Sequence, residues 1–307
     1  MGLNANSIKL LFEARAAGVS FARTATLGRQ FLACAPAILD ELMAKFDPSG
    51  SRGGGVRAAN EPFADRFFKS LGAHEIVAVD YSAYEGAEIV HDMNQPIPAI
   101  YYEQFDTVID GGTLEHVFNY PVAIKNAMDM VKCGGHLVLI TPINNFCGHG
   151  FYQFSPELFF RLLTAANGFR VNRAVLWEER VDPIFYHVDD PALIGRRVEL
   201  ASRYPVLLMI QAEKTAPMAI LKTPQQSDYS AIWNGESTVN VARRAGWITT
   251  VKRNLIFQIF TRFPRFSTPL RRMHRWLQVR ATSLQQEPGF RRIGRLASHR
   301  RNERISR

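Results

Sequence analysis

Between Arg23 and Lys214 the chain alternates short apolar runs with segments of helical periodicity. This alternation predicts a parallel sheet with helices on both faces, because strands that are buried on both sides read as continuous apolar runs and need crossovers to connect them. The candidate strands are 24–27, 75–79, 88–90, 105–109, 136–140, 171–176 and 206–212. We therefore predict an α/β fold, a doubly wound domain around a seven-stranded, mostly parallel sheet.

Two apolar stripes indicate crossover helices between these strands. The apolar residues of Pro62–Leu71 fall on one helical face, and so do those of Val122–Val131. The glycine-rich stretch 47–60 has the composition of a loop. After Lys214 the alternation stops, so we divide the chain into a leader over 1–21, the α/β domain over 22–213 and an extension over 214–307.

Charge is distributed unevenly along the chain. Residues 250–307 hold 15 Lys and Arg against 2 Asp and Glu, a net charge of +13, whereas the first 249 residues hold 22 against 26, a net charge of −4. Within this basic extension Leu270, Met273 and Leu277 share one helical face. The pattern fits a helix on an anionic membrane, a helix docked on the domain or a protein partner, or, less well, nucleic acid. We expect residues 287–307 to be disordered.

The cysteines and the lack of a long apolar run argue against several classes of protein. Cys34, Cys133 and Cys147 are an odd number without a CxxC pair, so neither a disulfide framework nor a cysteine zinc site is expected. No run approaches the roughly 18 apolar residues of a membrane-spanning helix. The N-terminus shows neither a cleavable signal nor a myristoylation pattern. We expect a cytoplasmic protein, attached to a membrane at most peripherally.

The run Glu75–Asp80 is an apolar strand that ends in a carboxylate. In open α/β sheets ligands bind beyond the carboxyl ends of the strands, and an acid at the end of the second strand can accept both hydroxyls of a ribose. Asp80 is therefore our first candidate for a cofactor-binding residue. The alternative is structural: Asp80 caps a helix or closes a turn.

A second informative segment joins two strands through glycine motifs. It reads FDTVIDGGTLEHV over 105–117 and, after a helix, VKCGGHLVLITP over 131–142. A buried strand ends here at Asp110, and the glycines let a ligand approach the backbone. In their residues and spacing both segments resemble the class I S-adenosylmethionine-dependent methyltransferases, whose fourth and fifth strands commonly carry such sequences. The resemblance extends over 22–213 and is strongest over 75–142.

This resemblance implies a Rossmann-like domain that binds S-adenosyl-L-methionine across the ends of its strands. A carboxylate near the methionine part suits the ammonium and the positive sulfur of that cofactor. The implied contacts are Asp80 at the ribose, Asp92 with Met93 at the adenine, and Asp110 with Gly111 at the methionine part. Their neighbours Tyr81 and Gly112 are further candidates for cofactor binding.

The chain departs from the family after the first strand, where a glycine-rich loop is usual because only glycine lets the backbone come so close to the cofactor. We place this cofactor loop at Gly28, Arg29 and Gln30, directly after the strand 24–27. The rival placement uses Gly53–Gly55. We prefer Gly28 because no strand precedes the glycine run.

The segment Asn144–Pro156 follows the fifth strand, on the ligand edge of the sheet. It combines amide, imidazole, phenol and hydroxyl groups with two glycines, a mixture suited to orienting a polar acceptor under an aromatic lid. We expect this loop to bind the acceptor, or alternatively to be structural, with aromatic rings that fill the space above the sheet. The expected acceptor-binding residues are Asn144, Asn145, Tyr152 and Gln153.

Two histidines are candidates for a catalytic base. A base is needed only where the acceptor must lose a proton, and an imidazole titrates in the useful range. His116 and His149 rank almost equally, with Glu115 as an orienting partner. We expect no metal site, because His187 with Asp189–Asp190 offers too few clustered ligands.

The leading functional hypothesis is methyl transfer from S-adenosyl-L-methionine to a small-molecule or glycan-like acceptor. The runner-up is a catalytically silent scaffold of the same fold, which binds a protein partner or an anionic membrane through its basic extension. A nicotinamide-dependent oxidoreductase ranks third, because the glycine fingerprint of that class is absent.

Overall fold

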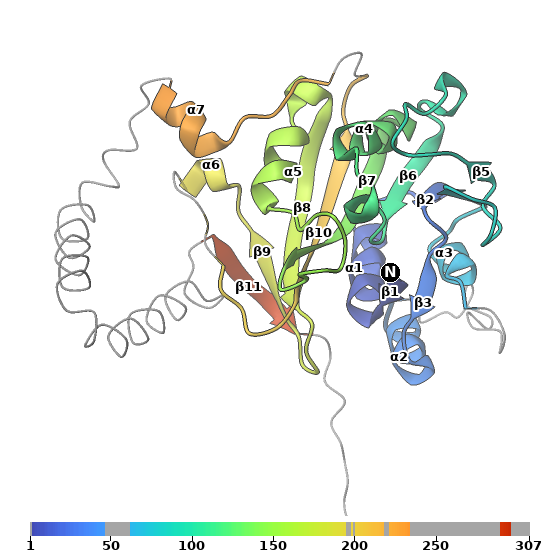
Figure 1. The fold of residues 1–307 in the computed structure, drawn as a ribbon. Helices are drawn as coiled ribbons and strands as arrows, with labels where there is room; N and C mark the ends of the chain where they lie inside the picture. The colour runs from blue at the N-terminus through green and yellow to red at the C-terminus, as the bar shows by residue number, and fades with distance from the viewer. Residues whose placement is uncertain are drawn as a thin grey trace, which may run out of the picture.

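A computed structural model describes residues 2–46, 62–194, 198, 200–217, 221–233 and 289–295. Its strands are β1 (Gly2–Asn4), β2 (Arg23–Leu27), β3 (Phe31–Ala33), β4 (Glu75–Asp80), β5 (Ile89–Val90), β6 (Phe105–Asp110), β7 (Val131–Asn144), β8 (Phe169–Glu178), β9 (Ile184–Val188), β10 (Val206–Lys214) and β11 (Phe290–Arg295). Its helices are α1 (Ala5–Ala16), α2 (Pro36–Phe46), α3 (Asp65–Ser70), α4 (Tyr120–Met130), α5 (Pro156–Leu162), α6 (Pro191–Ile194) and α7 (Ser227–Trp233), with a short 3₁₀ helix η2 (Leu114–His116) before α4. Nine strands form one sheet in the order β11-β9-β8-β10-β7-β6-β2-β4-β5, and β1 pairs with β3 (Figure 1).

Half of the sheet, from β5 to β7, is parallel. β2 lies between β4 and β6, with Leu27 opposite both Val79 and Asp110. The chain runs outward from β2 through β4 to β5 on one side and from β6 to β7 on the other, so the strand order reverses between β2 and β6. Ligands of open α/β sheets bind at such a reversal point, beyond the carboxyl ends of the strands.

The other half is antiparallel, which corrects the predicted sheet of seven mostly parallel strands. β10 pairs antiparallel with β7 and β8, and β9 and β11 extend the sheet by two further antiparallel strands. All seven predicted strands are present, in the order 3-2-1-4-5-7-6 when counted along the chain. β9 was not predicted, because it is a short run between Pro183 and Asp189. β11 was not predicted either, because it carries three arginines.

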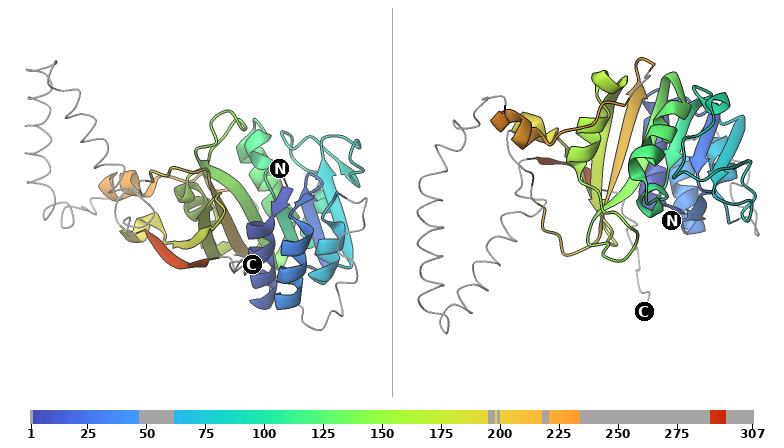
Figure 2. Two further views of the ribbon diagram at one scale, coloured as in Figure 1. Left: turned by 90° about the horizontal axis from the view of Figure 1, so that it is seen from below. Right: turned by 45° about the horizontal axis from the view of Figure 1, so that its top comes forward.

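Helices cover both faces of the sheet, as predicted (Figures 1 and 2). Val108 of β6 faces the core that α4 and α5 cover, whereas its neighbour Ile109 faces the core that α1, α2 and α3 cover. Successive side chains along the central strands β6, β7 and β10 alternate between these two apolar cores. Burial on both sides explains why the central strands read as uninterrupted apolar runs.

The N-terminal segment, which we predicted as a leader, is part of the domain. Asn4 caps α1 by accepting a hydrogen bond from the Ser7 N–H at 2.9 Å. The side chains of Ile8, Leu11 and Phe12 are buried in the core beside α2 and α3. The boundary predicted at residue 22 therefore cuts through a single core.

Part of the predicted extension also belongs to the domain. β11 pairs with β9, and the Arg291 guanidinium donates to the Asp189 carboxylate at 2.6–3.1 Å. The disorder predicted over 287–307 is therefore wrong for residues 290–295. Several predicted features lie outside the described residues. They are the loop 47–60 with the rival placement Gly53–Gly55, the apolar face of Leu270, Met273 and Leu277, and the rest of the segment predicted to be disordered. In the described part of the chain, no helix combines the length and the apolar character needed to cross a membrane.

Candidate active site

The carboxyl ends of β2, β4 and β6 bring three predicted segments together at the reversal point. The Gly28 N–H donates to the Val79 carbonyl at 2.8 Å, which ties the turn after β2 to the end of β4. Thr113, in the turn after β6, donates its hydroxyl to the Leu27 carbonyl at 2.7 Å. The turn at Gly28, the Asp80 carboxylate and the turn after Asp110 are therefore neighbours.

Gly28 occupies a place that requires glycine. Its φ of 66° lies in the left-handed region, and a Cβ would lie 2.9 Å from Thr113 Oγ1 and 3.9 Å from Asp80 Oδ2. The backbone thus turns directly beside the Asp80 carboxylate. The structure brings Gly28 and Asp80 together, as a cofactor loop after the first strand demands.

The side chains of Gln30 and Arg29 point in different directions from this turn. The Gln30 side chain is buried, and its Nε2 donates to the Leu27 carbonyl at 2.8 Å. Its Oε1 finds no hydrogen-bond partner among the described residues and packs over Gly111, where a Cβ would come within 2.0 Å of it. Arg29 reaches away, and its guanidinium lies 4.3 Å from the centre of the Phe63 ring. Gln30 therefore faces the site, whereas Arg29 anchors the loop from outside.

Asp80 is half-buried at the end of β4. Its Oδ1 accepts a hydrogen bond from the Tyr81 N–H at 2.6 Å, while Oδ2 is the oxygen nearer to Gly28. The Tyr81 side chain is 74% exposed. One carboxylate oxygen thus closes the local turn, and the other lies toward the reversal point.

The two residues predicted to hold adenine differ in their surroundings. Asp92 Oδ1 accepts hydrogen bonds from the backbone and the side-chain amide of Asn94 at 2.9 and 2.8 Å, and these bonds lower the Asp92 pKa. The Met93 side chain is buried in the core against Asn126 of α4. Asp92 remains accessible, whereas the Met93 side chain does not.

Asp110 ends β6 and is almost completely buried. Its Oδ1 accepts a hydrogen bond from the Thr113 N–H at 2.8 Å, and burial raises the pKa of Asp110 to about 6. Gly112 follows with a φ of 104°. A cationic ligand would stabilise this carboxylate, because its positive charge compensates for the lost hydration.

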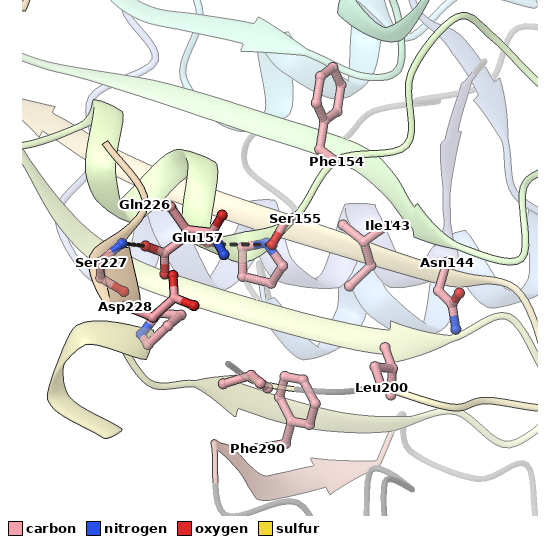
Figure 3. Close-up of a pocket in the computed structure, with 13 residues that line it drawn as sticks. Ile143, Asn144, Phe154, Ser155, Glu157, Leu200, Gln226, Ser227, Asp228 and Phe290 are labelled. Carbon is pink, nitrogen blue, oxygen red and sulfur yellow. Dashed lines mark hydrogen bonds between the residues drawn. The ribbon is translucent and has the colours of Figure 1, made fainter. Parts of the chain in front are cut away.

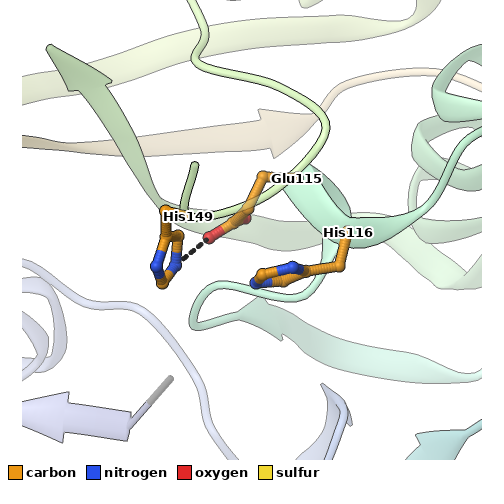
Figure 4. Close-up of side chains that lie close together, drawn as sticks. All are labelled: Glu115, His116 and His149. Carbon is orange, nitrogen blue, oxygen red and sulfur yellow. Dashed lines mark ion pairs between the residues drawn. The ribbon is translucent and has the colours of Figure 1, made fainter. Parts of the chain in front are cut away.

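Glu115, His116 and His149 converge between η2 and the loop after β7 (Figure 4). His149 Nε2 lies 3.6 Å from Glu115 Oε1, and the two imidazole rings are 5.0 Å apart between centroids. Glu115 is completely buried, and within the described structure neither carboxylate oxygen has a hydrogen-bond partner. Burial and the nearby Asp110 raise the pKa of Glu115 to about 8, whereas burial and His149 lower the pKa of His116. The three residues predicted for acid–base work are therefore neighbours.

Three of the four predicted acceptor-binding residues hold the loop after β7 in place. Each of them bonds to backbone atoms, which matches the structural alternative for this loop. The bonds run from Asn145 Nδ2 to the carbonyls of Ser202 and Tyr204 (2.8 and 3.0 Å), from the Phe146 N–H to Gln153 Oε1 (2.7 Å) and from the Tyr152 hydroxyl to the Phe118 carbonyl (2.6 Å).

Asn144, the fourth of these residues, lines a cavity of about 290 Å³ at the end of β7 (Figure 3). Ser155 and Glu157 bring polar groups to this cavity, and Phe290 of β11 brings an aromatic ring. Glu157 Oε1 accepts a hydrogen bond from the Ser227 N–H at 2.7 Å, which fixes the cavity wall. The cavity lies close to the lower limit of small-molecule sites, roughly 300 Å³. The predicted cofactor residues do not line it, so it is a separate place with room for part of an acceptor.

Two polar residues of the site, Thr113 and Tyr120, were not predicted from the sequence. Thr113 joins the turns after β2 and β6, and Tyr120 begins α4 with a buried hydroxyl that has no partner in the described part of the chain. Burial, with Asp110 and Glu115 nearby, raises the pKa of Tyr120 well above its ordinary value. Their only signal in the sequence is their position close to the LEHV motif.

No protein-family model matches this chain, and no curated protein matches it. Several solved structures are similar, among them S-adenosylmethionine-dependent methyltransferases, the family that the sequence resembles. A candidate methyltransferase of Bacillus halodurans is 11% identical, over 69% of this chain and 100% of its own, with a TM-score of 0.39. The 1,6-didemethyltoxoflavin-N1-methyltransferase of Burkholderia thailandensis, solved with S-adenosylhomocysteine, is 15% identical over 69% of this chain and 78% of its own, with a TM-score of 0.37.

A further similar structure belongs to a different class of enzyme. The branched-chain polyamine synthase of Thermus thermophilus, solved with 5′-methylthioadenosine, is 13% identical over 73% of this chain and 60% of its own, with a TM-score of 0.37. Identities and TM-scores this low do not establish an activity.

Proposed function

We propose that this protein transfers a methyl group from S-adenosyl-L-methionine to a small-molecule or glycan-like acceptor. The observation that carries the proposal is the meeting of Gly28, Asp80 and Asp110 at the reversal point of the sheet. A glycine turn, a ribose-binding carboxylate and a buried carboxyl then stand together where open α/β sheets bind their ligands.

The residues at this point fit the cofactor. Asp80 would accept hydrogen bonds from the ribose hydroxyls, and Asp92 would meet the adenine. Asp110 and the Gln30 Oε1 atom would face the ammonium group. A buried amide oxygen without a hydrogen bond is costly, and a cationic donor would remove that cost. When bound, the cofactor supplies a methyl carbon that its positively charged sulfur activates.

The main task left to the chain is to position the acceptor, because the methyl carbon is already activated. The loop after β7 is held to η2 by the N–H groups of Phe151 and Tyr152, which donate to the Glu115 carbonyl at 2.9 and 3.2 Å. This places His149 beside Glu115 at the ends of β6 and β7. The acceptor would bind under this loop, with the cavity beside Asn144 taking its more distant part.

His116 is the better candidate to accept a proton from a hydroxyl acceptor. Its lowered pKa keeps the imidazole neutral at pH 7, and its side chain is accessible. Glu115, with a pKa of about 8, holds its proton at pH 7, and its Oε1 lies 3.6 Å from His149 Nε2. The neutral carboxyl group beside the His149 ring would limit the orientations that the imidazole can take.

A catalytically silent scaffold is the second candidate, and two observations favour it. Gln30 packs over Gly111, on the path by which a cofactor would approach the backbone. The polar side chains of Asn145 and Gln153 are bonded to backbone groups. The basic extension would then attach the scaffold to a protein partner or an anionic membrane.

Calorimetric titration of the intact chain with S-adenosylmethionine, S-adenosylhomocysteine and NAD separates these functions. A methyltransferase binds the first two ligands, a silent scaffold binds none of them, and an oxidoreductase binds NAD. A folded chain that binds neither S-adenosylmethionine nor S-adenosylhomocysteine contradicts the proposal.

A further inference from the structure

The convergence of Glu115, His116 and His149 offers more than acid–base chemistry. One ligand atom of each residue, a carboxylate oxygen or an imidazole nitrogen, lies within 4.8 Å of the other two. Figure 4 shows the three side chains directed toward a common point between η2 and the loop after β7. Across the described ranges of the chain, no other group of three histidine, cysteine or acidic side chains is arranged in this way.

The Glu115 carboxylate itself also points to a bound ion. Glu115 is 0% exposed, and within the described ranges neither of its oxygens accepts or donates a hydrogen bond. A buried carboxylate without partners is strongly unfavourable unless a proton or a cation neutralises it. The Tyr120 hydroxyl is buried and similarly unpartnered in that part of the chain. The site therefore contains polar atoms that the described residues leave unsatisfied.

Backbone contacts fix this arrangement. The Phe151 N–H donates to the Glu115 carbonyl at 2.9 Å, which holds the loop that carries His149 against η2. A Cβ at Gly150 would lie 2.8 Å from that same carbonyl oxygen, so the close approach depends on glycine. His116 follows Glu115 in η2. The three ligands are thus supplied by two segments that the backbone locks together.

Two imidazoles and one carboxylate are ligands that zinc and related transition metal ions prefer. Catalytic zinc sites use three protein ligands, two histidines and a glutamate among the common sets, and leave a further position open. Other divalent transition metals accept the same nitrogen and oxygen donors. Mg²⁺ and Ca²⁺ fit less well, because they prefer oxygen ligands alone.

We propose that Glu115, His116 and His149 bind one divalent transition metal ion of the zinc class, with an open position for an oxygen of the acceptor. This inference revises the sequence-based expectation that the chain has no metal site. It deepens the proposed function, on which the role of the open position rests, because a bound metal lowers the pKa of a hydroxyl that it coordinates. The two histidines would then act as ligands, and the coordinated hydroxyl would lose its proton to the solvent, so that no side-chain base is required.

The test uses the intact chain without a polyhistidine tag, stripped of metal with a chelator and dialysed. Calorimetric titration with Zn²⁺ should show one site per chain, and the bound ion should raise the thermal unfolding temperature, because it binds only the folded state. Co²⁺ should compete for the same site and develop a visible absorption band. The absence of stoichiometric Zn²⁺ binding would overturn the proposal.

Variants decide whether these three residues are the ligands. His149→Ala, at a partly exposed position, should lower the Zn²⁺ affinity by more than about 100-fold, since even losses outside the ligand set cost 10- to 100-fold. Glu115→Gln, which keeps the shape of the side chain, should do the same. His74→Ala, at an exposed position before β4, is the matched control and should bind Zn²⁺ like the wild type. Equal Zn²⁺ affinity in all four proteins would overturn the assignment.

A parallel titration with S-adenosylhomocysteine tests the proposed cofactor site independently of the proposed metal site. Zn²⁺ binding without S-adenosylhomocysteine binding would support the metal site and contradict methyl transfer. S-adenosylhomocysteine binding without Zn²⁺ binding would support the cofactor site and overturn the metal proposal.

Discussion

Glu115 Oε1 and His149 Nε2 lie 3.6 Å apart, although the two residues belong to different segments of the chain. The carboxylate is completely buried, and the imidazole side chain is 31% exposed. The pair therefore connects the apolar interior with the accessible edge of the sheet. Burial raises the pKa of Glu115, the interior member of the pair.

The first prediction concerns the pH dependence of stability. Glu115 has a pKa of about 8 in the folded chain against an ordinary value of 4.5, so the folded state keeps a proton that the unfolded state releases between these values. Stability should therefore fall as the pH rises through this window, by at most about 1.4 kcal/mol per pH unit from this group. Asp110, with a pKa of about 6, adds a change of the same sign at lower pH.

Glu115→Gln removes the contribution of Glu115 to the pH dependence of stability and leaves that of Asp110. Urea denaturation in the presence of a chelator, repeated across this pH range, should give a flatter dependence for the variant than for the wild type. Parallel curves for the two proteins would show that Glu115 does not hold its proton in the folded state.

The second prediction concerns the turn at Gly28. Gly28→Ala should lower the affinity for S-adenosylhomocysteine by at least about tenfold, because the new Cβ meets Thr113 Oγ1 at 2.9 Å inside the proposed cofactor turn. Gly72→Ala is the control: its φ of 100° is strained for alanine as well, but its Cβ would meet nothing within 4 Å. Both variants should lose about 1 kcal/mol of stability, and only the first should lose affinity. Equal affinities would place the cofactor loop elsewhere.

The third prediction concerns the basic extension. Deleting residues 250–307 removes β11, whose Phe290 is buried and whose Arg291 pairs with Asp189, and should lower the thermal unfolding temperature by several degrees. Deleting only residues 296–307 keeps β11 and should leave that temperature unchanged. Scanning calorimetry of both proteins checks this. An unchanged unfolding temperature after the longer deletion would mean that the extension is separable from the domain.

The parallel half of the fold could be predicted because its strands are buried on both sides and its helices carry clear apolar stripes. The helix expected over 122–131 is α4, Tyr120–Met130. The antiparallel edge could not be predicted in the same way. β11 lies at the edge of the sheet with charged side chains, and its pairing with β9 joins segments far apart in the sequence. The residue pattern within one segment does not predict pairing with a segment so distant in the sequence.

The positions of Asp80 and Asp110 in the site could be predicted from strand direction alone, because parallel neighbours end at the same edge. For the same reason His116 and His149 could be predicted to lie close together, because they follow the neighbouring parallel strands β6 and β7. The roles of Asn145 and Gln153 could not be predicted, because they depend on the conformation of one loop. Asn145 has a φ of 59°, which directs its amide to the carbonyls of Ser202 and Tyr204.

In the proposed methyltransferase, Asp80 at the end of β4 binds the cofactor at the reversal point of the sheet. We would titrate S-adenosylhomocysteine calorimetrically into Asp80→Ala and Glu75→Ala, which alter acidic residues at opposite ends of that strand. Asp80→Ala should weaken binding by about 1 to 3 kcal/mol, or about 5- to 150-fold, the scale of a lost hydrogen bond to a charged group. Glu75→Ala should bind like the wild type. Wild-type affinity in a folded Asp80→Ala protein would show that Asp80 does not bind the cofactor.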